Sequence, residues 1–118
     1  MIYTDFNAGG KDYKLRLSTR NIVALEKAIG GNPLSIFGNG DELPSVTTMV
    51  NILFHSLQKF HHGIGLNEAY DIFDEYLEEH SMTEFIQVIL DVYKVSGIIK
   101  DEAPAEGEEI KNAVAEEI

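Results

Sequence analysis

The chain has 118 residues, a length that suits one domain with a single hydrophobic core, and it contains no cysteine. Its 9 basic and 20 acidic residues give a net charge of −11. This charge disfavours binding to nucleic acid or to anionic membranes, because both require basic surface. The lack of cysteine excludes disulfides, thiolate metal sites and thiol catalysis.

The charge is unevenly distributed along the chain. Residues 1–100 carry 8 basic and 13 acidic side chains, a net charge of −5, whereas residues 101–118 carry 1 and 7, a net charge of −6. The first residues lack the basic end and apolar run of a signal peptide, and no stretch approaches the roughly 18 apolar residues of a membrane span. We therefore expect a soluble, intracellular protein.

Residues 1–17 have the pattern of a β-hairpin. Apolar and polar residues alternate over residues 2–6 and again over residues 13–17, and Asn-Ala-Gly-Gly at residues 7–10 is typical of a turn. Because two strands alone are barely stable, the hairpin must lie on the helices or pair with another chain.

Residues 18–100 have the apolar spacing of amphipathic helices. The first helix is expected to begin at Ser18 or Thr19 and to end at Gly30, with a short second helix at residues 33–37.

Three longer helices are expected after this short one. They are predicted over residues 46–61, over residues 68–79 with Asn67 as the N-cap, and from a capping box at Ser81 and Glu84 to about residue 96. The buried face of the middle one is expected to comprise Ala69, Tyr70, Phe73, Tyr76 and Leu77. The predicted fold is mainly α within the α+β class: one globular domain over residues 1–100, built from four to five helices and the hairpin, followed by a flexible acidic tail over residues 101–118.

The tail has an apolar spacing of its own. Ile110, Val114 and Ile118 recur every four residues, so in a helix they would share one face. So short a helix does not persist alone in water, and the segment is therefore either frayed or docked.

No group of polar residues has the pattern of a catalytic or metal site, so we expect no enzyme activity, cofactor or metal. Residues 71, 74, 75 and 78 place four carboxylates on one helix face, typical of a solvated surface or of an acidic partner contact. The four histidines, at positions 55, 61, 62 and 80, do not have the spacing of three convergent zinc ligands. His61 and His62 are instead expected near the favourable dipole at the end of a helix.

The last helix is apolar around most of its circumference. It is either the central helix of the bundle or is shared between the core and a partner interface. The excess apolar width of this helix and of the helix over residues 46–61 predicts partner-binding residues on both. They are Met49, Phe54, Phe60, Phe85, Ile89, Val92 and Tyr93.

The order of these segments resembles the small tail assembly chaperones of long-tailed phages and prophages of Gram-positive bacteria. The resemblance covers roughly residues 12–100, and its individual segments are Leu17–Lys27, Gly31–Leu34, Leu43–Ser45, Leu57–Phe60, Tyr70–Tyr76 and Val88–Gly97. It implies a non-enzymatic protein of the host cytoplasm, absent from the mature virion, that binds the tape measure protein, keeps it soluble and helps tail tube subunits to assemble. It also implies that a ribosomal frameshift could produce a longer form of the chain.

Two other functions stay open from the sequence. The chain could be a structural tail component, such as a completion or adaptor protein, in which the hairpin adds an edge strand to a ring. It could instead be an acidic DNA mimic that occupies a DNA-binding cleft. The sequence also leaves homo-oligomerisation open.

Overall fold

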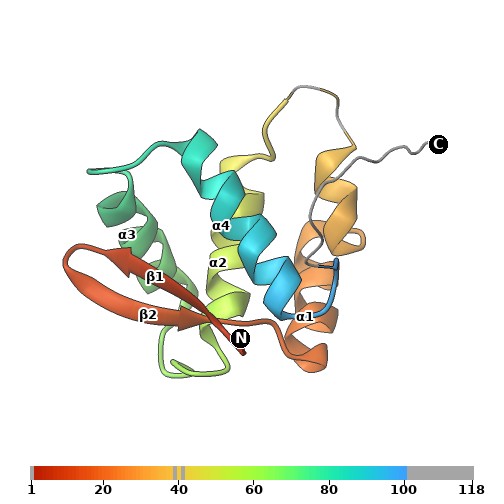
Figure 1. Cartoon of the computed structure of the whole chain (residues 1–118), viewed down its shortest axis with the longest axis horizontal. Coiled ribbons are helices and arrows are strands. Elements are labelled where there is room, and N and C mark those ends of the chain that lie inside the picture. The colour runs from red at the N-terminus through yellow and green to blue at the C-terminus, as the bar shows by residue number, and fades with distance from the viewer. Residues whose placement is uncertain (1, 39, 41, 101–118) are drawn as a thin grey trace.

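The computed structural model describes residues 2–38, 40 and 42–100, and in this part the chain folds as an α+β protein (Figure 1). A two-stranded antiparallel hairpin is followed by four α-helices and one short 3-10 helix, which confirms the predicted fold class. The elements are β1 (Thr4–Ala8), β2 (Lys11–Leu15), α1 (Thr19–Ile29), the 3-10 helix η1 (Pro33–Phe37), α2 (Val46–Leu57), α3 (Leu66–Tyr76) and α4 (Met82–Val95). The predicted tail at residues 101–118, with its apolar residues at 110, 114 and 118, lies outside the described residues.

The hairpin turns in two residues rather than in the four that the sequence suggested. Gly9 and Gly10 have φ angles of 60° and 77°, and the ladder pairs Ala8 directly with Lys11. Such a turn requires positive φ at both central positions, which glycine adopts without strain. A Cβ atom at Gly9 would also lie 2.7 Å from the Glu75 carboxyl group, but this group is at the far end of an exposed, flexible side chain that can shift aside, so the positive φ angle is the main reason for glycine here.

The hairpin lies on the helices of its own chain (Figure 1). The Phe6 ring stacks on Tyr76 of α3 with a centroid distance of 5.1 Å. The outer edge of β2 is bonded to the end of α2 and the residues after it: the Lys14 N–H donates to Nε2 of His61 (3.0 Å) and the Arg16 N–H to the Ser56 carbonyl (2.9 Å). These bonds satisfy backbone groups that a free strand edge would leave unpaired.

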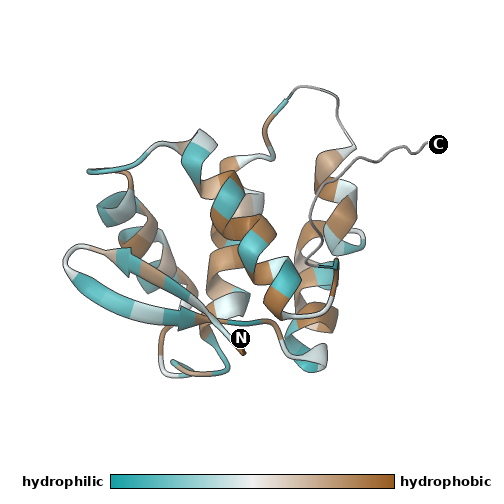
Figure 2. Ribbon diagram, viewed as in Figure 1, coloured by the Kyte–Doolittle hydropathy of each residue, from teal (hydrophilic) through white to brown (hydrophobic). Residues whose placement is uncertain are grey.

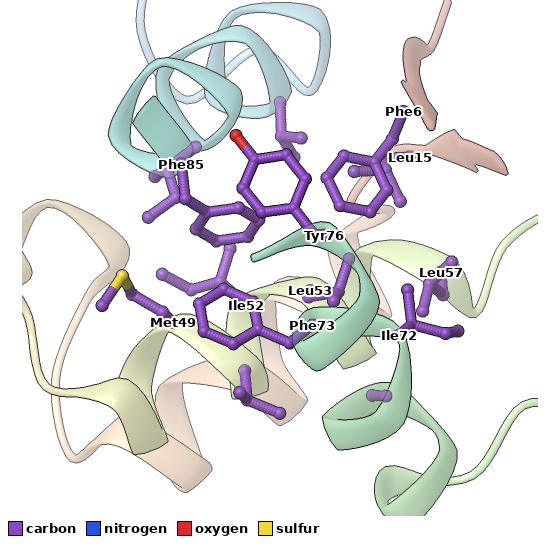
Figure 3. Packing of buried hydrophobic residues seen from close by; sticks show 14 of the residues in the cluster. Phe6, Leu15, Met49, Ile52, Leu53, Leu57, Ile72, Phe73, Tyr76 and Phe85 are labelled. Carbon is purple, nitrogen blue, oxygen red and sulfur yellow. The ribbon is translucent and has the colours of Figure 1, made fainter. Parts of the chain in front are cut away.

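Helices α2 and α4 supply much of the hydrophobic core. Both carry many hydrophobic residues (Figure 2), and buried side chains from both lie in the core cluster (Figure 3). The end of α4 is held by the segment that joins β2 to α1. Nη1 of Arg16 donates to the Val95 carbonyl (2.8 Å), and the Leu17 N–H donates to Oγ of Ser96 (2.9 Å). The fully buried hydrophobic residues of these two helices are Met49, Val50, Ile52, Leu53, Leu57, Phe85, Ile89, Val92 and Tyr93.

Most of the helices begin at a residue whose side chain caps the first turn. Ser81 and Glu84 form the predicted capping box, with the Ser81 N–H donating to the Glu84 carboxylate (2.7 Å) and the Glu84 N–H to Oγ of Ser81 (3.1 Å). Asn67 is not the N-cap of α3, which begins after Gly65. The Glu68 carboxylate accepts from the Gly65 N–H (3.3 Å) and so stabilises this earlier start.

The buried face of α3 also differs from the prediction. Tyr70 is 37% exposed, whereas Ile72, which the sequence analysis left out, is only 6% exposed. Residues 69, 72, 73 and 76 follow the i, i+3, i+4, i+7 spacing of one helix face, and Tyr70 lies beside it. In the part of the chain that the structure describes, no helix has the length and apolar character to cross a membrane.

Candidate partner-binding surface

Five of the seven predicted partner-binding residues are core residues. Met49, Phe85, Ile89, Val92 and Tyr93 are each 1% exposed or less. These five side chains therefore do not form part of the exposed surface of the described structure. The reason is that the hairpin, α1, α3 and η1 cover α2 and α4 from several sides, so the broad apolar circumference of these helices serves the core.

Phe54 and Phe60 remain partly accessible, as the prediction requires. Both side chains are half-buried. The Phe60 ring contacts Tyr3 edge-to-face at 5.7 Å, and Phe54 contacts His55 at 4.8 Å. Their role in binding stays a prediction.

Four of the exposed large apolar side chains lie on η1 and on the chain that leads into α2. Leu34, Phe37, Leu43 and Val46 are each between 39% and 45% exposed. We call these four residues the η1–α2 surface. They neighbour, in the sequence, the walls of a small open cavity of about 210 Å³. Its lining residues are Ile29, Ser35, Ile36, Pro44, Ser45 and Thr48.

The size and lining of this cavity suit a protein side chain better than a cofactor. Ligand pockets are typically about 300–1,000 Å³ and hold several convergent polar or charged groups. This cavity is smaller, and its lining contains hydroxyl groups but no charged side chain. The cavity therefore has room for one side chain of a partner, against a wall that is mostly polar.

Tyr93 positions this surface from inside the core. Its hydroxyl donates a hydrogen bond to the Pro33 carbonyl (2.8 Å), and its ring meets Phe37 edge-to-face at 6.2 Å. Burial raises the pKa of Tyr93, so the hydroxyl stays protonated and remains a donor. Tyr93 was predicted to contact a partner directly, but its side chain lies in the core, behind η1.

The polar residues singled out in the sequence do not converge. Among the described residues, no group of three or more His, Asp or Glu side chains could hold a metal ion. Nδ1 of His55 bonds the Asn51 carbonyl (2.8 Å), and His80 lies 3.6 Å from the Glu84 carboxylate. The carboxylates of α3 and the turn after it, at residues 68, 71, 74, 75, 78 and 79, are all exposed.

His61 is the histidine with the clearest structural role. Its Nε2 accepts from the Lys14 N–H, and its ring lies edge-to-face on Tyr13 at 5.4 Å. An acceptor nitrogen must be unprotonated, so this bond requires the neutral ring with hydrogen on Nδ1. Burial, with a smaller contribution from the Lys14 ammonium group, lowers the pKa of His61 below its ordinary value of 6.5.

This bond predicts that acid weakens the fold through His61. As pH falls through 6.5, the unfolded chain takes up a proton at this histidine before the folded chain does, so the free energy of unfolding falls until the lowered folded pKa is passed. His61→Gln keeps an acceptor but cannot titrate. Urea unfolding at a series of pH values should show a shallower loss of stability below pH 6.5 in this variant. The exposed His62→Gln variant is the control, and equal slopes in wild type and His61→Gln would contradict the assignment.

Sequence reasoning missed the η1–α2 surface because each of its segments is short. The 3-10 helix has only five residues, too few for a periodic pattern to separate a buried from an exposed side. Two features of the sequence could have indicated this surface. Pro33 marks the first position of a short helix. Leu34 and Phe37 are large apolar residues on this helix, which can bury only one of its sides. Comparison with family models, with curated proteins and with solved structures found no match to this chain.

Proposed function

We propose that this protein is a non-enzymatic tail assembly chaperone of a long-tailed phage or prophage. In this role it binds the tape measure protein in the host cytoplasm, keeps it soluble and assists tail tube assembly. The proposal rests on the resemblance of residues 12–100 and on one structural observation, the exposed apolar residues of the η1–α2 surface, whose sequence neighbours line an uncharged cavity.

The chemistry of this surface suits a carrier. A tape measure protein presents apolar helical stripes before the tube encloses it, and an amphipathic helix binds by laying such a stripe in an apolar groove. Four large side chains, each still more than half buried, offer moderate contact area, so the partner can later be displaced. The net charge of −11 opposes aggregation of the complex.

The direct test is co-expression with the tape measure protein encoded nearest to the gene, followed by size-exclusion chromatography of the soluble fraction. We expect the partner to be insoluble alone and to co-elute with this chain. A partner that stays insoluble while this chain elutes unchanged would reject the chaperone function.

The η1–α2 surface predicts which substitutions weaken that complex. Leu43→Ser with Val46→Ser removes exposed apolar groups, and losing about 1.4 kcal/mol or more of contact energy raises the dissociation constant at least about tenfold. Titration calorimetry on the soluble complex measures this change.

The matched control is Leu66→Ser with Tyr70→Ser, which removes similarly exposed apolar groups from α3. Circular dichroism verifies that both double variants fold. Equal affinity of the two variants would place the binding surface elsewhere.

One observation favours a second function, that of a DNA mimic. The six carboxylates at residues 68, 71, 74, 75, 78 and 79 are exposed on a folded element, as a mimic of the phosphate backbone requires. Competition with duplex DNA for a nuclease or repressor of the same phage, lost on neutralising these residues, would support this function over the chaperone.

A further inference from the structure

The outward face of α1 combines small apolar side chains with basic ones. Arg20, Val23, Ala24, Lys27 and Ala28 are all exposed, and Val23 is 46% exposed. Their spacing of i, i+3, i+4, i+7 and i+8 places them on one side of the helix. We call these five residues the α1 face.

No carboxylate offsets the positive charge of the α1 face from within the helix. The only acidic residue of α1, Glu26, is half-buried and lies about 130° around the helix from the centre of this face, at 100° per residue. The other side of α1 packs against α2 and η1, with Leu25 fully buried. The α1 face is therefore an unpartnered apolar and basic strip among the described residues.

The end of the described chain lies beside the start of α1. The Leu17 N–H donates to Oγ of Ser96 (2.9 Å), so the residues just before α1 contact those just after α4 (Figure 1). Ile98 and Ile99 still pack against the core. The described part of the chain therefore ends within a few residues of a contact with the segment that leads into α1.

The sequence of this last segment is complementary to the α1 face. Residues 101–118 carry 7 acidic side chains and 1 basic one, and Ile110, Val114 and Ile118 recur every four residues. In a helix these three would span about 12 Å, the same length as Arg20 to Ala28. The nine residues 101–109 can extend to about 30 Å, enough to reach the whole of α1.

We propose that residues 108–118 bind the α1 face of the same chain. The apolar residues at 110, 114 and 118 cover Val23, Ala24 and Ala28, while the flanking glutamates lie near Arg20 and Lys27. Tethering makes this contact intramolecular and thus effective even when the individual contacts are weak. The inference does not depend on the proposed function.

The distribution of charge favours the α1 face over the other exposed surfaces as the binding site of the acidic segment. The exposed carboxylates of α3 repel an acidic segment. The stretch over residues 33–46, which holds the η1–α2 surface, contains two acidic residues and no basic one. The docked segment thus leaves the η1–α2 surface open.

The test uses the full chain with one nitroxide label. Because the protein has no cysteine, Asn112→Cys gives a single labelling position, on the side of a helix opposite to residues 110, 114 and 118. We expect paramagnetic loss of amide NMR signals at residues 20–28 and not over α3. Raising the salt to about 1 M, where the Debye length is about 3 Å, should restore most of these signals.

Two charge-reversed variants separate this contact from nonspecific attraction. Arg20→Glu with Lys27→Glu should restore the α1 signals, whereas Lys11→Glu with Lys59→Glu, which reverses two other exposed cations, should not. Uniform signal loss over the domain, or equal signals in both variants, would overturn the proposal. Signal loss in an isotope-labelled, nitroxide-free chain mixed with a nitroxide-labelled one would show binding between copies and would overturn the intramolecular form.

Discussion

Ile89→Asp is expected to leave the chain unfolded at room temperature. Ile89 is completely buried in the middle of α4. The substitution loses about 1.5–3 kcal/mol of apolar burial and adds the larger cost of an unpaired buried charge. Together these approach the total stability of a small domain, about 5–15 kcal/mol. Circular dichroism and the dispersion of amide NMR signals measure the outcome.

Phe54→Asp is the matched control for this variant. Phe54 is half-buried, so an aspartate there keeps access to water and the chain should fold. An Ile89→Asp variant that unfolds cooperatively within about 1 kcal/mol of wild type would contradict the packing of α4. Loss of partner binding in Ile89→Asp would report unfolding rather than a lost contact, and this variant therefore cannot map an interface.

Phe85→Ala is expected to reduce the free energy of unfolding by about 3–5 kcal/mol. The Phe85 ring meets Phe73, Tyr76 and Phe6 at centroid distances of 5.1, 5.5 and 6.1 Å. These residues come from α4, α3 and β1, so the cavity left by alanine opens where three elements meet (Figure 3). Because about 1 kcal/mol shifts the Tm of a domain this size by about 4–8 °C, the Tm should fall by more than about 10 °C.

Urea unfolding of Phe85→Ala and of Tyr70→Ala tests this packing. Tyr70 is also aromatic but is exposed, and its removal should change the free energy of unfolding by less than about 1 kcal/mol. Similar losses in the two variants would show that the aromatic cluster does not stabilise the fold.

Local signals in the sequence predicted the elements of this fold but not all of their boundaries. Gly9 and Gly10 mark the turn, and Ser81 with Glu84 starts α4, because these residues form their characteristic bonds within a few positions of themselves. The start of α3 was misplaced because asparagine is the more common N-cap residue, whereas Gly65 has no side chain and takes part only through its backbone N–H and carbonyl.

The exposed apolar surface was harder to predict because exposure depends on residues far away in the sequence. Helical spacing shows that Ile89 and Val92 are on an apolar face, but not that other elements cover them. Phe37 shows the reverse case: it is large and apolar, yet it stays partly exposed since η1 is held at the edge of the core by the Tyr93 hydroxyl. Only tertiary contacts distinguish these two situations.

The bonds between the β2–α1 segment and the end of α4 also bear on synthesis at the ribosome. Each of these two bonds joins residues 79 positions apart in the sequence: Arg16 with Val95, and Leu17 with Ser96. A nascent chain can form its hairpin and α1 early, since these elements use neighbouring residues. The hydrogen bonds that join them to the end of α4 cannot form until residue 96 has left the exit tunnel. Contacts of such long sequence separation form late because the intervening loop must first be closed. The domain therefore cannot complete its folding before residue 96 is available, and earlier intermediates expose the apolar side of α2.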